Sequence, residues 1–151
     1  LIPGAGNSYE AEYLWQHGFK NIFLLDISNE PLQNFKSRVK DFPESQLLLG
    51  NFFNHSNTYD LVIEQTFFCA LHPEQRNDYA KKMLQLLNPS GKIAGLLFDF
   101  ELDENGPPYG GSLDEYTNLF NPAFKIKTLE RSYNSIKPRA GKELFFIFEK
   151  K

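Results

Sequence analysis

The sequence predicts an α/β domain with a doubly wound, mostly parallel sheet that has one antiparallel strand near the C-terminus. Short apolar runs such as Asn21–Asp26 alternate with segments whose apolar residues recur at helical spacing. This alternation is typical of a parallel sheet with helices on both faces. The last two predicted strands, Phe124–Ser132 and Glu143–Glu149, leave no room for a helix between them and should pair antiparallel. A length of 151 residues fits one domain over residues 1–151.

The chain opens on a strand end at Leu1–Pro3 and a glycine turn at Gly4–Ser8. Ser8 is expected to cap a helix over residues 9–17, which Gly18 ends. A strand this short, with no Met before it, indicates that preceding residues are missing. The predicted inner face of the helix holds Ala11, Leu14 and Trp15.

The next strand–helix unit begins at Asn21–Asp26, a continuous apolar run that ends in an acid, as buried parallel strands do. Ser28 is expected to cap the following helix, whose first turn holds Pro31. Gln46–Gly50 then predicts a third strand. The inner face of this second helix consists of Leu32, Phe35 and Val39.

The second half of the chain continues the alternation. A polar loop rich in proline and glycine, Asp99–Gly111, is long enough to indicate a function. The elements expected around it are a strand at Tyr59–Thr66, a helix that opens at Pro73 and ends at Asn88–Gly91, a strand at Lys92–Phe98 and a helix at Leu113–Phe120.

Composition and charge argue against several classes of protein. Apolar residues make up 41% of the chain and aromatic residues 15%, enough for a buried core. The net charge of −3 and the lack of a basic stripe make nucleic acid a poor partner. No apolar run approaches the ~20 residues of a membrane-spanning helix. The single cysteine, Cys69, fits a reducing, cytoplasmic compartment, and we expect a monomer or weak oligomer.

A nucleoside-binding site is predicted at the carboxyl ends of the first two strands. Gly4 and Gly6 follow a strand and precede a helix, so the backbone can turn tightly and approach a ligand closely. Asp26 ends the next strand, where dinucleotide folds place a carboxylate for the ribose hydroxyls. A plain glycine turn and a helix-capping acid are the alternatives for these residues.

Position 9 distinguishes between two nucleoside cofactors. The nicotinamide fingerprint has its third glycine there, whereas this chain has Tyr9, whose side chain would crowd a pyrophosphate. S-adenosylmethionine (SAM) has no pyrophosphate and tolerates Tyr9. The loop therefore favours a methyltransferase over a dehydrogenase.

Polar and aromatic residues also follow the third and fourth predicted strands. The Asn51 amide can hydrogen-bond the adenine edge and Phe52 can stack on its face, with a turn before two core phenylalanines as the alternative. Glu64 lies in an otherwise apolar strand and needs a partner, since an unpaired buried carboxylate is costly. Phe67 and Phe68 either wall the methyl-acceptor pocket or pack in the core.

The chain offers no convincing histidine–acid pair or metal cluster. We interpret His17, His55 and His72 as structural or solvated, and we expect no metal. Methyl transfer from SAM needs little acid–base help, because the sulfonium already activates the carbon. A thiolate or halide acceptor is itself a good nucleophile and demands no strong base.

Longer motifs resemble the thiopurine S-methyltransferase family, and within it the bacterial and plant branch of thiol, thiocyanate and halide methyltransferases. The stretch from Phe67 to Arg76 and the segment Gly106–Tyr109 are far more specific than the glycine turn. The resemblance runs the full length of the chain. Its segments are Pro3–Gly6, Leu25–Ser28, Gly50–Phe53, Gln65–Arg76, Tyr79–Ala80, Leu86–Gly91, Gly106–Tyr109 and Arg139–Glu143.

The resemblance implies a class I SAM-methyltransferase sheet of seven strands, which is Rossmann-like, with SAM as the cofactor. It places Arg76 near the acceptor pocket, where it would attract an anionic acceptor, and Tyr109 on a loop closing over the acceptor. A helix-surface salt bridge is the alternative for Arg76. The implied cofactor contacts are Gly4 and Gly6 with the amino-acid part, Asp26 and Ile27 with the ribose and adenine, Asn51 and Phe52 with the adenine, and Glu64 and Gln65 beside the methionine part.

The chain departs from the family pattern in three places. Many members have Asp where Asn51 stands, and methyltransferase glycine loops often have Gly at the position of Ser8. The N-terminal lid segment, which in the family helps to cover SAM and the acceptor, is expected to be missing.

The sequence thus predicts an enzyme that moves a methyl group from SAM to a small soft nucleophile, namely a thiol, thiocyanate, a halide or a thiopurine-like compound. One alternative is a non-catalytic SAM-binding regulatory module, which would have no need of Arg76 or Gly106–Tyr109. The other is an NAD-dependent oxidoreductase, which Tyr9 and the antiparallel final strands disfavour.

Overall fold

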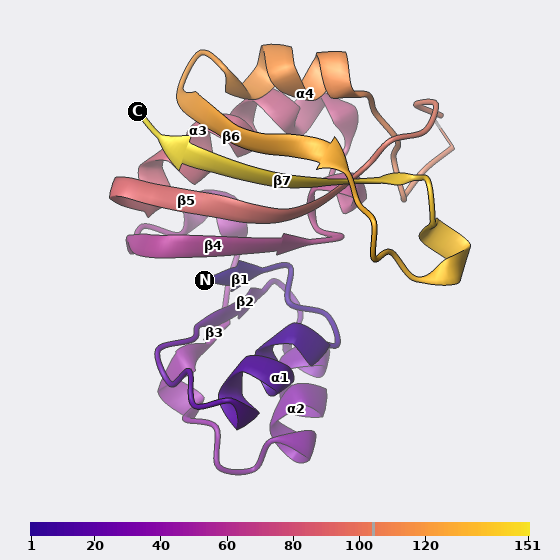
Figure 1. Ribbon diagram of the computed structural model, residues 1–151. Coiled ribbons are helices and arrows are strands. Elements are labelled where there is room, and N and C mark those ends of the chain that lie inside the picture. Colours follow the sequence, from indigo (N-terminus) through magenta and orange to yellow (C-terminus); the bar gives the residue numbers. More distant parts are fainter. Residues whose placement is uncertain (104) are drawn as a thin grey trace. The chain divides into compact units, whose positions relative to one another are not determined.

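Seven strands form two sheets in the computed structural model, which describes residues 1–103 and 105–151 (Figure 1). The chain divides into two compact units, Leu1–His55 and Ser56–Lys151. A single domain over the whole chain stays a prediction.

The first unit is a parallel three-stranded sheet with two helices. Strand β1 (Ile2–Pro3) pairs with β2 (Leu24–Asp26), and β2 pairs with β3 (Leu47–Leu49). The paired segments are shorter than the apolar runs in the sequence. Helices α1 (Tyr9–Gln16) and α2 (Asn29–Arg38) each follow a strand, as the alternation predicted.

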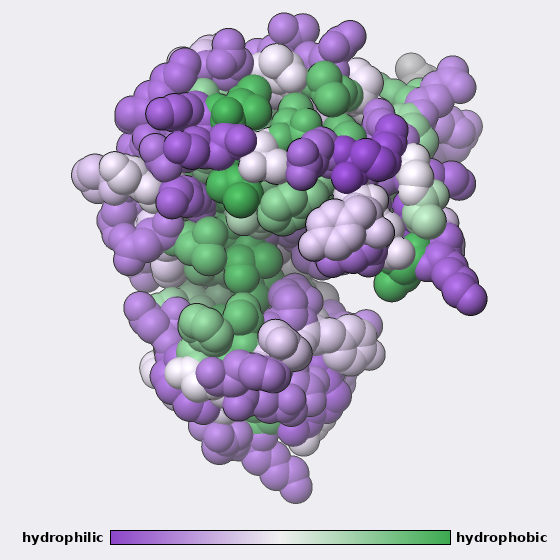
Figure 2. Space-filling view, viewed as in Figure 1, coloured by the Kyte–Doolittle hydropathy of each residue, from purple (hydrophilic) through white to green (hydrophobic). Residues whose placement is uncertain are grey.

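Aromatic rings join the two helices of the first unit. The ring centroids of Trp15 and Phe42 lie 4.8 Å apart, and Phe35 meets Phe42 edge-on at 4.9 Å. The outward surface over α1 and α2 is mostly hydrophilic, as expected of helices with one buried face (Figure 2). The predicted inner faces are confirmed at Ala11, Trp15, Leu32, Phe35 and Val39, which are buried, while Leu14 is half-buried.

The predicted capping by serine hydroxyls is wrong at both helices. Ser8 and Ser28 occupy the N-cap positions, but neither hydroxyl bonds to its helix in the described chain. Ser8 has a left-handed backbone (φ 49°), and its hydroxyl donates to the carbonyl of Ala5 at 2.6 Å. At α2 the N–H of Ser28 instead donates to Asp26 Oδ1 at 2.9 Å.

The second unit is a mixed sheet in the order β4-β5-β7-β6. Strand β4 (Tyr59–Gln65) runs parallel to β5 (Leu87–Phe98). Strand β7 (Glu143–Lys150) is antiparallel to both β5 and β6 (Phe124–Arg131), which confirms the predicted antiparallel pairing.

Helices α3 (Arg76–Leu86) and α4 (Leu113–Phe120) contact each other and pack on β5 and β6 respectively. The helix ends at Leu86, just before the predicted stop at Asn88–Gly91, but β5 starts directly after α3 and takes in these residues as an irregularity in which Ser90 has φ 62°, so the strand begins before the predicted Lys92. The register accordingly passes from Tyr59 opposite Leu87 to Leu61 opposite Lys92. Five 3-10 turns complete the described elements: Glu44–Gln46, Phe52–Asn54, Phe68–Ala70, Pro73–Gln75 and Lys137–Arg139.

Candidate functional site

The glycine turn of the first unit has an unusual backbone. Gly4 (φ 60°), Gly6 (φ 51°) and Ser8 (φ 49°) all adopt the left-handed region, which glycine enters without strain. A Cβ on Gly6 would meet nothing closer than the Gly4 carbonyl oxygen at 3.8 Å. The glycine at position 6 is therefore required by its dihedral angle, and the space beside it is open.

Asp26 connects this turn to the end of β2. Its Oδ2 accepts a hydrogen bond from the Gly6 N–H at 3.1 Å, and its Oδ1 accepts one from the Ser28 N–H at 2.9 Å. Ile27, the next residue, is 75% exposed. The two residues predicted to bind the ribose and adenine thus lie beside the glycine turn, and the carboxylate retains acceptor capacity.

Asn51 follows β3 and starts a 3-10 turn. Its Oδ1 accepts from the Phe53 N–H at 2.9 Å, which is the turn geometry named above as the alternative. The side chain is exposed, so its amide N–H₂ group still reaches the surface. Phe52 is buried, which leaves little of its ring face for adenine.

Glu64 near the end of β4 has the partners that the sequence required. Its side chain is fully buried. Oε1 accepts from the N–H groups of Phe67 and Phe68 at 2.8 and 2.9 Å, and Oε2 accepts from the Tyr79 hydroxyl at 2.5 Å. These bonds hold a tight turn in which Thr66 has φ 61°, a strained conformation for a β-branched residue. Glu64 therefore positions the end of β4 from within.

The two phenylalanines after β4 have different environments. Phe68 is buried in the core, where its ring meets Tyr79 at 4.9 Å and Tyr116 at 5.8 Å. This burial favours the core alternative for Phe68, and its role in the wall of an acceptor pocket stays a prediction. Phe67 and Gln65 are half-buried and stay candidates.

Arg76 lies in the interior of the second unit, with 4% of its surface exposed. Nη1 pairs with Glu115 Oε1, and Nη2 donates to the Gly110 carbonyl at 2.6 Å. Arg76 thus forms the salt bridge considered as its alternative, but the arginine side of the pair is buried and not on the helix surface. The guanidinium instead fixes the end of the loop 99–111 onto α3 and α4, and its charge is compensated.

Tyr109 is held against the turn after β4. Its N–H donates to the Cys69 carbonyl at 2.8 Å, and its side chain is buried. The ring packs so closely on Gly106 that a Cβ there would lie 2.6 Å from the tyrosine Cδ1. The loop that the resemblance assigned to the acceptor is thus anchored to the second unit by its backbone and by this ring.

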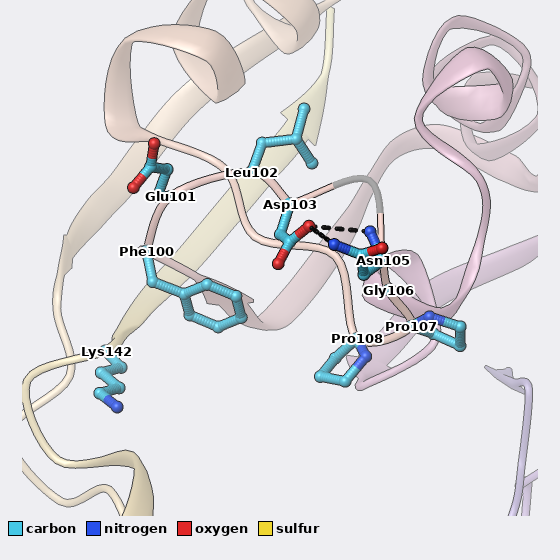
Figure 3. Close-up of a pocket in the computed structure, with 9 residues that line it drawn as sticks. All are labelled: Phe100, Glu101, Leu102, Asp103, Asn105, Gly106, Pro107, Pro108 and Lys142. Carbon is cyan, nitrogen blue, oxygen red and sulfur yellow. Dashed lines mark hydrogen bonds between the residues drawn. The ribbon is translucent and has the colours of Figure 1, made fainter.

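The same loop, together with Lys142, lines an open hollow of about 820 Å³ (Figure 3). Asp103 accepts hydrogen bonds from the N–H and side-chain amide of Asn105 at 2.9 and 2.7 Å, which shapes one wall. Residue 104 of the loop lies outside the described residues. The lining residues are Phe100, Glu101, Leu102, Asp103, Asn105, Gly106, Pro107, Pro108 and Lys142.

Sequence reasoning did not identify Glu115, Phe100 or Lys142 as site residues. Glu115 is 39 positions from Arg76, and no local spacing links the two. In the described part of the chain, no helix has the length and hydropathy to cross a bilayer, and no group of three or more potential metal ligands occurs.

Solved structures share this fold. A SAM-dependent methyltransferase from Methanosarcina mazei superimposes with a TM-score of 0.79 at 13% identity, covering 99% of this chain and 90% of that one. The Burkholderia thailandensis 1,6-didemethyltoxoflavin-N1-methyltransferase, solved with S-adenosylhomocysteine, gives a TM-score of 0.79 at 17% identity over 99% and 70% of the two chains. The chain therefore has the α/β fold of class I SAM-dependent methyltransferases, as the sequence predicted.

The model of the thiopurine S-methyltransferase family matches residues 1–150. The chain belongs to this family. It is 29% identical to the probable thiol methyltransferase 2 of Arabidopsis thaliana and to thiocyanate methyltransferase 1 of Brassica oleracea, in each case over 95% of this chain and 66% of the relative. It is 35% identical to a Vibrio cholerae thiopurine S-methyltransferase over 58% of this chain and 41% of that one. The chain thus spans about two thirds of the plant relatives.

Proposed function

We propose that the protein transfers a methyl group from SAM to a small soft nucleophile, such as a thiol, thiocyanate, a halide or a thiopurine-like compound. Family membership supports the class of reaction. One observation supports the choice of cofactor: the Gly6 N–H donates a hydrogen bond to the Asp26 carboxylate at the carboxyl ends of β1 and β2. Open α/β sheets bind their ligands at such strand ends.

The residues of the first unit fit an adenosyl group. The left-handed glycine turn lets a ligand approach the backbone closely. Asp26 uses one bond per carboxylate oxygen for the protein, so each oxygen can still accept from a ribose hydroxyl. Exposed Ile27 offers an apolar surface to the adenine, and the Asn51 amide a donor to its edge. Glu64 and Gln65 stay predicted neighbours of the methionine part.

In the proposed reaction, bound SAM supplies a methyl group activated by its sulfonium. The chain contributes orientation and exclusion of water, for which Tyr109 and its anchored loop are suited. The enzyme's own thiol does not compete for the methyl group. Burial raises the pKa of Cys69 to about 12, so it stays protonated at neutral pH.

Asp26→Ala tests the cofactor site. We expect SAM to bind about 5- to 150-fold more weakly by calorimetry, corresponding to ~1–3 kcal/mol for ribose hydroxyls that lose their acceptor. The matched control is Asp41→Ala, which removes a carboxylate of the same unit that bonds the Trp15 indole at 2.9 Å. Unchanged SAM affinity in Asp26→Ala would remove this residue from the site.

Catalysis is tested separately with the complete natural protein and a panel of thiol, thiocyanate, halide and thiopurine acceptors. We expect S-adenosylhomocysteine to form with at least one of them. SAM binding without product from any acceptor would favour the non-catalytic regulatory module.

A further inference from the structure

The ion pair between Arg76 and Glu115 joins a buried cation to a partly exposed anion. The side chains are 5% and 35% exposed. The guanidinium also lies 4.9 Å from the Phe68 ring and donates to Gly110. A buried guanidinium without a counterion is costly, so the position of Glu115 is coupled to that of Arg76.

Glu115 also faces a second, smaller hollow beside the loop, of about 310 Å³. A Cβ on Gly111 would lie 3.0 Å from Glu115 Oε2, so the carboxylate is closely covered on that side. It lies in the first turn of α4, where the helix dipole favours a negative charge. The hollow is lined by Asp99, Phe100, Glu101, Leu102, Gly111, Ser112 and Glu115.

Acidic side chains outnumber basic ones among the other described residues that line the two hollows. Asp99 pairs with Arg131 at 2.5 Å. Among the described residues that line the larger hollow, the charged side chains are one cation, Lys142, and two acids, Glu101 and Asp103. Glu115, which lines the smaller hollow, therefore places a negative charge beside any anion bound there, and this carboxylate also neutralises the adjacent Arg76.

We propose that Glu115 determines specificity, because its carboxylate neutralises Arg76 and so lowers the affinity of the acceptor side for anions relative to uncharged acceptors. This inference rests on the proposed methyl transfer and refines it. It also accounts for the buried position of an arginine that the sequence assigned to anion attraction. A unit charge at ~8 Å changes the affinity for an anion by about 3- to 30-fold at effective dielectric constants between protein and water.

The test is thiocyanate binding to the complete natural protein with S-adenosylhomocysteine present, followed by NMR titration. Glu115→Gln keeps an oxygen for Arg76 and removes the negative charge, so the Kd for thiocyanate should fall about 3- to 30-fold. Arg76→Gln should raise that Kd. The double variant, which is neutral like the parent pair, should return to within about twofold of the parent.

Two controls separate charge from structure. Thiourea is uncharged, and its affinity should change less than about twofold in every variant, whereas a structural defect would weaken both probes together. Leu102→Lys adds a cation at an exposed position shared by both hollows and leaves the ion pair intact. It should also tighten thiocyanate binding, and the size of that change calibrates how strongly a single charge beside the hollows acts on the anion.

An unchanged ratio of thiocyanate to thiourea affinity in Glu115→Gln, or in Arg76→Gln if the former is unfolded, overturns this inference. The proposed function fails on a different observation, namely that the parent forms no S-adenosylhomocysteine with any acceptor. The ratio of thiocyanate to thiourea affinity can be measured without turnover, so the two failures are distinguishable.

Discussion

The two units of the chain use the polar residues at and after their strand ends in different ways. In the first unit, Asp26 and Asn51 are at least partly exposed and accept bonds from nearby backbone N–H groups. In the second unit, Glu64 and Arg76 are almost fully buried, and their side chains also bond to other side chains, those of Tyr79 and Glu115. A polar residue at a strand end can thus bind a ligand where it keeps capacity at the surface, and it supports the fold where it does not.

Glu64→Ala should give the largest loss of stability. A small loss would contradict the view that buried polar residues support the fold of the second unit. The change leaves two buried N–H groups and the Tyr79 hydroxyl without their acceptor, so we expect a loss of about 3–5 kcal/mol in the free energy of unfolding. Urea unfolding can be followed in each unit separately. The sole tryptophan, Trp15, reports on the first unit, and the sole cysteine, Cys69, reports on the second through its accessibility to a thiol reagent.

Glu64→Gln is the matched control, since it keeps one oxygen for the backbone N–H groups and should lose less. If Glu64→Ala instead has the urea midpoint of the parent but binds SAM more weakly, Glu64 acts as a ligand-binding residue and not as a support of the fold.

The local elements could be predicted from the sequence because their signals are local. The helix Leu113–Phe120 has the predicted bounds, and the antiparallel pairing of the last strands follows from the short segment between them. The serine caps failed for a different reason. The conformation of Ser8 is set by the glycine turn around it, and the third residue of α2 is Pro31, which has no N–H to donate to the Ser28 hydroxyl.

The candidate site was predictable only in part. Asp26 lies beside the glycine turn as expected, because parallel strands bring their carboxyl ends to one edge. Burial bears on the alternatives considered for Phe68 and Arg76, and burial depends on residues far along the chain. Glu115 carries no signal in its own neighbourhood beyond that of an acid in the first turn of a helix.

Gly6→Ala should give the next largest effect, and it tests whether the first unit depends on backbone geometry. Alanine in the left-handed region costs about 1–2 kcal/mol, and here open space removes any added clash. We expect that loss in the free energy of unfolding reported by Trp15 fluorescence. Gly50→Ala is the control: its Cβ would make an ordinary 3.9 Å contact with Leu25, so the loss should stay below about 0.5 kcal/mol. Equal losses in the two variants would contradict the requirement at position 6.

Alkaline pH should produce the smallest effect, and it should act on the second unit. Burial raises the pKa of Cys69 to about 12 and raises the pKa values of Tyr79 and Tyr116 in the same direction. The folded state therefore holds protons that the unfolded chain releases, so stability is full below the unfolded thiol pKa of about 8.5 and falls as pH rises toward 12.

The urea midpoint, followed by tyrosine absorbance at about pH 8, 9.5 and 11, should decrease across this range. Cys69→Ala removes one of the three groups and should make the decrease shallower. An equally steep decrease in that variant would assign the alkaline sensitivity to the tyrosines alone, and a flat profile in the parent would show that these groups titrate alike in the folded and unfolded chain. In that case the folding of the second unit would not be linked to the protonation of these three groups.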